Sequence, residues 1–344
     1  MDSDLLFSEI TRAKTQLGPN VVILVHHYQR DEVIQFADFS GDSLELSRIA
    51  AQQKTARYII FCGVDFMAET AAMLCDPAQT VILPAGDAPC PMAQMATVEQ
   101  AQEAWEMLTG MWGDDMIPIT YQNSSAALKA FCGRHGGAVC TSSNAERLFR
   151  WALGEKTHLV FFPDEWLGTN SALALGIPGD KIVVWAPDGP EASLERARNA
   201  VVVVWKGYCH VHTFFTVEHV HQARAQYPGI RVIVHPECPV DVVQAADAYG
   251  STAQIIRYVE QAAPGSMVAI GTEINMIGRL ARQHPDKTVV PLARSLCGTM
   301  YRTSPQGLRD ALLSCIAGKP INAIQVDQET ARWANLALER MLNL

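Results

Sequence analysis

Residues 21–28, VVILVHHY, decide the fold. Five apolar residues, four of them β-branched, are followed at once by two histidines and a tyrosine. A run that is apolar at every position is typical of a parallel strand buried on both faces. In open α/β sheets, ligands bind beyond the carboxyl ends of such strands. The stretch therefore indicates both a parallel α/β fold and a ligand site at the strand ends.

Ten further apolar runs repeat this pattern along the chain. They lie at residues 58–63, 80–86, 116–123, 137–143, 158–164, 181–187, 201–207, 231–237, 267–273 and 288–293. Helical patterns separate most of them, which predicts an α/β protein with parallel sheets. Eleven strands are many for one sheet, so we expect two or three small α/β units. Residues 187–200 break the rhythm with Pro, Gly and charges, and we expect a surface excursion with a short helix there.

Composition narrows the class of protein. The chain has 344 residues, is 49% hydrophobic and carries a formal net charge of −9. An acidic chain is a poor partner for nucleic acid. The start of the sequence is acidic where a signal peptide is basic, and no apolar stretch is as long as a membrane span. We therefore expect a soluble, cytoplasmic protein, in which the nine cysteines do not form disulfides.

Reactive side chains follow nearly every apolar run. They are His26, His27, Tyr28, Cys62, Cys90, Tyr121, Asn123, Thr141, Ser142, Asp164, Cys209, His210, His212, His235, Glu237, Glu273 and Cys297. Three of the cysteines, Cys90, Cys209 and Cys297, stand in Gly- or Pro-flanked loops, about one α/β unit apart. No C-x-x-C pattern occurs, which argues against a zinc ribbon or a ferredoxin-like binding run. Three isolated loop cysteines could still converge on one centre. Most of the remaining cysteines stand in apolar or helical patterns, where we expect core packing.

The segment VHPEC, residues 234–238, ends another predicted strand. His235 and Glu237 are two residues apart in an extended segment, so both point the same way and suit an acid/base pair. The H-x-E pattern of zinc deaminases needs a later P-C-x-x-C, and none follows. A strand that simply runs into a turn, with a hydrogen-bonded histidine and a solvated glutamate, remains an alternative.

Three predicted helices begin with similar capping patterns. These are Asp42-Ser-Leu-Glu45, Ser143-Asn-Ala-Glu146 and Ser251-Thr-Ala-Gln254. Each can satisfy free amides at a helix start. If all three starts face one cleft, they could also bind anionic groups such as carboxylates or phosphate.

Taken in order, the motifs resemble one family, quinolinate synthase. The matching segments are VHHYQ (25–29), ADFSGDSLELS (37–47), FCGVDFMAETA (61–71), LPAGDAPCPMA (83–93), YQNSSAALKA (121–130), VCTSSNA (139–145), FFPDEWLG (161–168), WKGYCHVH (205–212), VHPEC (234–238), GSTAQII (250–256), GTEINM (271–276) and CGTM (297–300). Each motif is modest alone, but their order along the chain is very specific. Two departures are Asp65, where relatives often have His, and the last loop, which lacks a frequent Lys.

The resemblance implies a fold and a cofactor. The expected fold is three small parallel-sheet α/β units in a pseudo-threefold arrangement around a central iron–sulfur cluster site. The expected units are residues 1–92 with 298–344, 93–208 and 209–297. The implied cofactor is a [4Fe-4S] cluster with three cysteine ligands, Cys90, Cys209 and Cys297, and one open iron. Such an iron can act as a Lewis acid.

The resemblance also implies a reaction and its residues. Iminoaspartate and dihydroxyacetone phosphate condense to quinolinate, phosphate and two waters, and an aspartate oxidase or dehydrogenase supplies the iminoaspartate. The implied catalytic residues are Glu237, Tyr28, Tyr121 and His235. The implied substrate-binding residues are His26, Ser43, Tyr121, Asn123, Ser142, His235, Glu237, Ser251 and Thr252, with Thr141 a weaker candidate. Cys238 should point away from the chemistry.

Two rival hypotheses remain. A zinc- or mononuclear-iron-dependent lyase or hydrolase would use His210, His212, His235 and Glu237 and would contain no sulfide. A non-catalytic iron–sulfur sensor on the same fold would keep its function when Glu237 or Tyr28 is replaced. The many acid/base side chains at strand ends argue against the sensor.

Overall fold

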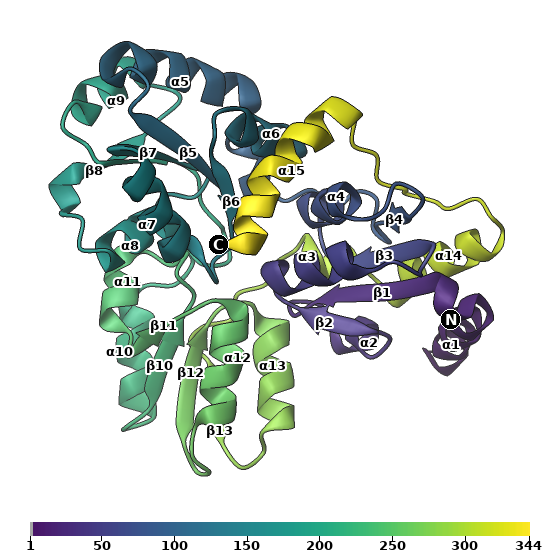
Figure 1. The fold of residues 1–344 in the computed structure, drawn as a ribbon. Coiled ribbons are helices and arrows are strands. Elements are labelled where there is room, and N and C mark those ends of the chain that lie inside the picture. Colours follow the sequence, from purple (N-terminus) through teal and green to yellow (C-terminus); the bar gives the residue numbers. More distant parts are fainter. Residues whose placement is uncertain (1–2) are drawn as a thin grey trace.

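The strands form three separate sheets in the computed structural model, which describes residues 3–344 (Figure 1). The first sheet has the order β2–β1–β3–β4, with β1 at Val21–His26, β2 at Phe39–Gly41, β3 at Tyr58–Cys62 and β4 at Thr80–Ile82. The second has the order β6–β5–β7–β9–β8, with β5 at Met116–Tyr121, β6 at Ala138–Cys140, β7 at His158–Phe162, β8 at Ile182–Trp185 and β9 at Val202–Trp205. The third has the order β11–β10–β12–β13, with β10 at Arg231–Val234, β11 at Ala248–Tyr249, β12 at Met267–Gly271 and β13 at Thr288–Pro291.

The predicted α/β class with three parallel-sheet units is confirmed. All ten strand pairings are parallel, and every residue of β1, β3 and β5 is buried, as strands covered on both faces require. Each of the eleven apolar runs contains a strand. The sequence analysis missed β2 and β11, because these edge strands have three and two residues and only one neighbour each.

The three sheets share one topology. In each, the first strand of the unit lies second in the sheet, the second strand lies at the edge, and the third follows on the other side. The second sheet adds β8 at its far edge, followed by the short helix α9 (Pro190–Ala197), as expected for the excursion at residues 187–200. Figure 1 shows the three sheets arranged around a common centre.

Helices cover the sheets and supply the connections. Those of the first part of the chain are α1 (Ser3–Leu17), α2 (Asp31–Ile34), α3 (Ser43–Gln52), α4 (Asp65–Leu74), α5 (Val98–Trp112), α6 (Ala126–Arg134), α7 (Ala145–Glu155) and α8 (Glu165–Ala174). The later ones are α10 (Val217–Gln226), α11 (Val240–Ala245), α12 (Thr252–Gln261), α13 (Ile274–Gln283), α14 (Pro305–Ile316) and α15 (Gln328–Asn343). Within residues 3–344, no helix combines the length and apolar character needed to span a bilayer.

The end of the chain differs from the unit boundaries that we expected. Helix α14 packs against α1 in the first unit, but α15 lies against α6 and β6 of the second. Buried Ala334, Ala337 and Leu338 give α15 an apolar stripe, and this stripe joins the core that includes Phe131 of α6. Residues 298–344 therefore divide between two units, and α15 crosses from one to the other (Figure 1).

The units are not independent in their packing. One buried cluster combines Leu24 of β1 and Ile59 of β3 with Ile233 of β10 and Ile270 of β12. Apolar side chains of the first and third sheets are thus removed from water together. This shared core holds the carboxyl ends of strands from different sheets at one place, where the candidate site lies.

Candidate active site

A small buried cavity lies where the strand ends of the three units meet, and we call it the chamber. Its volume is about 60 Å³. The chamber is lined by every predicted site residue except Ser251, namely His26, Tyr28, Ser43, Cys90, Tyr121, Asn123, Ser142, Cys209, His235, Glu237, Thr252 and Cys297. Side chains as far apart in the sequence as His26 and Cys297 are therefore brought together. Thr141, His210 and His212 also line it.

Parallel strand ends position most of these side chains. His26 ends β1 and Tyr121 ends β5, while His235 directly follows β10. The backbone then turns: the Tyr28 amide donates to His26 Nδ1 over 3.1 Å, and the Cys238 amide donates to the His235 carbonyl over 3.0 Å. Each turn aims polar side chains past the end of its sheet, as expected for a ligand site in an α/β fold.

The carboxylate of Glu237 lies between two histidines. His212 Nδ1 lies 2.6 Å from Glu237 Oε2, and His235 Nδ1 lies 3.2 Å from the same oxygen. The two imidazole rings stack with their centroids 4.2 Å apart. Burial acts to raise the pKa of Glu237, but His212 and His235 outweigh it and hold that pKa well below its ordinary value. Burial lowers the pKa of His212 to about 4, and Glu237 acts in the opposite direction.

Tyr28 connects this group to the third sheet. Its hydroxyl lies 2.7 Å from Thr272 Oγ1, which lies 3.1 Å from His212 Nε2. The Thr252 hydroxyl donates to the Tyr28 oxygen over 3.4 Å. Burial raises the pKa of Tyr28 and that of Tyr121 well above their ordinary values, so both phenols keep their protons. Thr272 was missed by the sequence analysis, although it directly follows β12 and strand-end position could have indicated it.

The three loop cysteines line the chamber as free thiols, and each follows a strand of a different sheet, β4, β9 or β13. Burial raises the pKa of Cys90 to about 12, with a further contribution from the neighbouring Cys297. Burial also raises the pKa of Cys209, and the charges of Glu237, Cys297 and Cys90 add to that shift. Thiols that close together in a buried site are poor thiolates without a cation, and iron would supply the compensating charge. The donor set therefore fits a [4Fe-4S] cluster with three protein ligands.

Asp65 shapes one of these cysteine loops. Its Oδ1 accepts the backbone amide of Cys90 over 3.0 Å and that of Phe66 over 2.8 Å. The departure from the family pattern at this position therefore fixes the Cys90 loop at the start of α4 rather than facing the reaction. The sequence analysis named Asp65 without finding this role.

Cys238 lies away from the chamber. It is fully buried and packs in the core cluster of the third unit, with Val242 and Leu292. Its thiol points toward the Gly271 carbonyl at 3.9 Å. Cys238 points away from the chamber as predicted, but residues 235–238 form a turn and not the extended segment that we expected.

A second group of possible metal ligands lies in the chamber. The ligand atoms of Cys209, His212 and Glu237 lie within 4.8 Å of one another. His212 Nδ1 lies 2.6 Å from Glu237 Oε2. Two ligands about 2.1 Å from one tetrahedral zinc ion lie more than about 3 Å apart, so a zinc ion here would require these two side chains to separate. The zinc or mononuclear-iron alternative therefore stays a prediction.

Three helix starts, one from each unit, meet beside the chamber, and we call this the junction. The Ser143 hydroxyl donates to Asp42 Oδ2 over 2.6 Å and lies 2.8 Å from Ser251 Oγ. Asp42 and Ser251 cap α3 and α12 with complete capping boxes, as predicted. Ser251 thus stands at the junction, and the sequence analysis had placed its side chain with the substrate.

The predicted third capping pattern, Ser143-Asn-Ala-Glu146, is wrong. The N-cap of α7 is Asn144, and its side chain makes no capping hydrogen bond. The residue three positions on is Arg147, where α3 has Glu45 and α12 has Gln254. A guanidinium has no acceptor, so it cannot accept the amide of the cap residue. Asn144 instead accepts the Thr141 amide over 2.8 Å.

Comparison with known proteins identifies the family to which these features belong. The family model described as "Quinolinate synthetase A protein" matches residues 8–343. The chain is similar to a quinolinate synthase of Corynebacterium glutamicum, with 50% identity over 346 residues that cover 99% of this chain and 88% of the relative. It is 49% identical to the quinolinate synthase of Acidobacterium capsulatum, over 97% of this chain and 92% of the relative. It is 48% identical to that of Bacillus anthracis, over 99% and 94% respectively.

Proposed function

The chain belongs to the quinolinate synthetase A family, and from this we propose that it is an enzyme that forms quinolinate from iminoaspartate and dihydroxyacetone phosphate. The reaction joins the two carbon skeletons, closes the ring and releases phosphate and two waters. These products account for every atom of the two substrates. The reaction requires several proton transfers, because carbon–carbon bond formation, dehydration and ring closure each move protons.

One observation carries the proposal. Three thiols that follow strands of three different sheets line the same chamber as the buried Glu237–His212–His235 group. A cluster with an open iron and an adjacent acid/base group together match the needs of this condensation.

Glu237 is the proposed general base. It is ionised because His212 and His235 hold its pKa below the ordinary value, and it lines the chamber in which the substrates react. Tyr28 and Tyr121 keep their phenolic protons, so each can donate a hydrogen bond or pass on a proton. Thr272 holds the Tyr28 hydroxyl in place by the 2.7 Å contact.

The remaining polar residues are proposed to bind substrate. The hydroxyls of Ser43, Ser142 and Thr252 and the amide of Asn123 can donate to carboxylate and phosphate oxygens. His26 lines the same cavity, and burial lowers its pKa well below the ordinary value, so it binds as a neutral imidazole. Ser43 is the first residue of α3 and Thr252 the first of α12, where the helix dipoles also favour anions.

Cys90, Cys209 and Cys297 are the proposed ligands of a [4Fe-4S] cluster. When bound, the cluster would supply an iron without a protein thiolate, which acts as a Lewis acid on a substrate oxygen. The chain's own residues orient the substrates around that position and move the protons. Iminoaspartate must come from the oxidation of aspartate, and we propose that an aspartate oxidase or dehydrogenase supplies it in the cytoplasm.

The first test measures iron, acid-labile sulfide and zinc in protein purified without oxygen. Iron and sulfide near four per chain, without zinc, support the proposal and make a quinolinate assay decisive. Zinc near one per chain without sulfide would overturn it and favour a metal site at His212 and Glu237.

A set of matched cysteine variants tests the ligands. Cys90→Ser, Cys209→Ser and Cys297→Ser should each lose the cluster, measured as visible absorbance and as iron per chain. Cys238→Ser is the control, because Cys238 is buried in the core of the third unit, away from the chamber. This variant should keep the cluster. A full cluster in any of the first three variants would remove that residue from the ligand set.

A further inference from the structure

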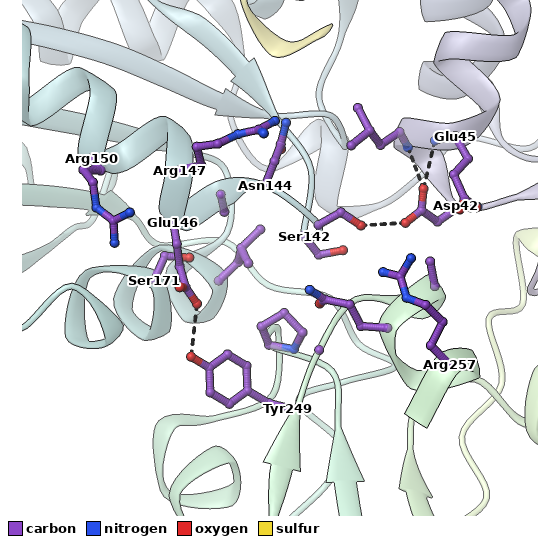
Figure 2. Close-up of a pocket in the computed structure, with 18 of the residues that line it drawn as sticks. Asp42, Glu45, Ser142, Asn144, Glu146, Arg147, Arg150, Ser171, Tyr249 and Arg257 are labelled. Atoms are coloured by element: carbon purple, nitrogen blue, oxygen red, sulfur yellow. Dashed lines mark hydrogen bonds between the residues drawn. The ribbon is translucent and has the colours of Figure 1, made fainter. Parts of the chain in front are cut away.

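A second and much larger cavity lies on the other side of the junction, and we call it the outer cavity (Figure 2). Its volume is about 640 Å³, against about 60 Å³ for the chamber. Residues of all three units line it, because α3, α7 and α12 begin there. Asp42 and Ser142 line both cavities. The outer cavity is therefore the solvent-side neighbour of the chamber.

The outer cavity carries arginines that follow the threefold arrangement of the helices. Arg48, Arg150 and Arg257 each stand six residues after the cap residue of their helix, which is Asp42, Asn144 or Ser251. All three side chains are exposed and line the cavity. Equivalent positions on equivalent helices thus supply one guanidinium from each unit. Figure 2 shows Arg150 and Arg257 on opposite sides of the cavity.

A fourth arginine, Arg147, adds to this group on α7. We call Arg48, Arg147, Arg150 and Arg257 together the arginine ring. Among residues 3–344, no hydrogen bond or ion pair occupies any of these four guanidiniums. They face the cavity with their hydrogen-bonding capacity open to a ligand.

The acidic residues of the outer cavity are occupied by other donors. Asp42 accepts the amides of Leu44 and Glu45 and the hydroxyl of Ser143. Glu45 accepts the Asp42 amide over 3.0 Å, and Glu146 accepts the Tyr249 hydroxyl over 3.0 Å. Four arginines therefore outnumber three carboxylates, and the carboxylates are bound locally. The field in this cavity favours anions.

The start of α7 also favours anions in the outer cavity. Asn144 makes no capping hydrogen bond, so the first amides of this eleven-residue helix are not satisfied by a cap side chain. Ala145, Glu146 and Arg147 of that first turn line the outer cavity. Free amides and the positive end of the helix dipole add to the charge of the arginines.

We propose that the outer cavity is an anion-binding vestibule, in which the arginine ring collects phosphate- and carboxylate-bearing substrates before they enter the chamber. This rests on the proposed function, because both substrates of that reaction are anions. The junction of Asp42, Ser143 and Ser251 separates the two cavities, so an anion held by the ring lies one side-chain layer from the chamber. Guanidiniums match phosphate and carboxylate in geometry as well as charge.

The test separates the vestibule from the chemistry. Binding of inorganic phosphate to the cluster-loaded protein is measured by calorimetry at low ionic strength for the wild type, the double variant Arg150→Gln/Arg257→Gln and the control Arg12→Gln. Arg12 is an exposed arginine of α1, remote from both cavities. We expect the double variant to bind phosphate about ten-fold more weakly, and Arg12→Gln to bind as the wild type does. Unchanged binding in the double variant would overturn the vestibule.

Steady-state kinetics test whether the arginine ring acts on substrates before they enter the chamber. For the double variant, kcat/KM for dihydroxyacetone phosphate should fall about ten-fold at low ionic strength and kcat by much less, and salt should narrow the gap to the wild type. An equal fall in kcat and kcat/KM would indicate a regulatory or structural role and contradict the proposal. If the wild type makes no quinolinate, the proposed function fails, but the phosphate titration still decides whether the ring binds anions.

Discussion

Glu237 holds its charge in an unusual place for a carboxylate. It is 2% exposed, yet its two partner imidazoles keep its pKa below the ordinary value. A buried carboxylate normally takes up a proton, because burial disfavours the charged form. Here the hydrogen-bonding imidazoles replace water as the solvent of the anion. The result is a base that is ready at neutral pH in the chamber.

Replacing this base should affect turnover and leave the cluster in place. Glu237→Gln keeps the size of the side chain but removes its ability to accept a proton, so kcat should fall by about 10²- to 10⁴-fold. Iron and sulfide should stay at wild-type levels, since no cysteine changes. Glu165→Gln is the matched control, because Glu165 is half-buried at the start of α8 and does not line the chamber. A Glu237→Gln enzyme as active as the control would remove Glu237 from the reaction.

Lys129 is a second buried charge, and it makes stability depend on pH. Its Nζ donates to the Ser124 carbonyl over 2.5 Å, and burial lowers its pKa from 10.5 to about 8. Between these values the unfolded chain binds a proton that the folded chain has lost, so the free energy of unfolding rises with pH. For this one group the rise should be about 2 kcal/mol between pH 7.5 and pH 9.5.

The variant Lys129→Met isolates this effect. Urea denaturation of cluster-free wild type and variant at both pH values gives the difference in unfolding free energy. The wild type should gain about 2 kcal/mol relative to the variant as the pH rises, since the variant lacks the titrating group. A difference that stays constant, or falls, would show that Lys129 keeps its proton in the folded chain.

Site residues could be predicted from the sequence where they stand close to the end of a predicted strand. His26, Tyr121, His235 and Glu237 follow apolar runs, and that pattern alone brought them into one group. Ser251 lies in the junction and lines neither cavity, so its predicted role in substrate binding stays a prediction. The role of Asp65 depends on a contact with the Cys90 loop, and that of Lys129 on complete burial, and neither is visible in a periodic pattern.

At the scale of the element, residues at helix starts can both stabilise their helix and contribute to the candidate site. Ser251 accepts the Gln254 amide as the cap of α12, and it also touches Ser143 of the second unit. Thr97 caps α5 with the same kind of box, but at an exposed position remote from the junction. The two residues offer the same local interaction in different surroundings.

Ser251→Ala and Thr97→Ala should each lower the free energy of unfolding by about 1 kcal/mol, because each removes one cap. Only Ser251→Ala should also change KM, since its hydroxyl belongs to the junction between the outer cavity and the chamber. Chemical denaturation measures the first effect, and steady-state kinetics the second. An equal change of KM in both variants would mean that the junction has no special part in substrate entry.

Elements were predictable where a pattern ran for several residues. All strands with a long apolar run were found, whereas β2 and β11 were not, because two or three residues carry no periodicity. The start of α7 was misplaced by one residue, since Ser143 and Asn144 both suit an N-cap and Glu146 suits the third position after Ser143 in a capping box. With Asn144 as the N-cap, the third helical position is Arg147, which cannot complete a capping box.

At the scale of the molecule, α15 is the link between two units. Asn335 donates to the Met73 carbonyl of α4 in the first unit over 3.0 Å. In the second unit, the Asn144 amide side chain donates to the Met341 carbonyl of α15 over 3.2 Å. The sequence analysis assigned residues 298–344 to the first unit, whereas α15 packs mainly on α6 and β6. The placement follows from the shape of the surface that α6 offers.

Gly133 allows α6 to offer a surface on which α15 packs closely. A Cβ at this position would lie 1.9 Å from the Trp333 carbonyl oxygen of α15, so the two backbones approach as only glycine allows. Gly133→Ala must push α15 away and should lower the free energy of unfolding by about 1–3 kcal/mol or more. Gly154→Ala in α7 is the matched control: nothing lies within 4 Å of its Cβ, and the gain in helix propensity should stabilise the protein slightly.

The displacement of α15 should also reach the site, because Met341 holds Asn144, and Asn144 is the cap residue of α7 at the edge of the outer cavity. Gly133→Ala should therefore raise KM as well as lower stability, and cleavage by protease between α14 and α15 should become faster. Thermal unfolding, steady-state kinetics and limited proteolysis measure the three effects. Loss of stability with an unchanged KM would separate α15 from the junction and limit it to a structural clamp. An unchanged stability would contradict the close packing of α6 and α15 itself.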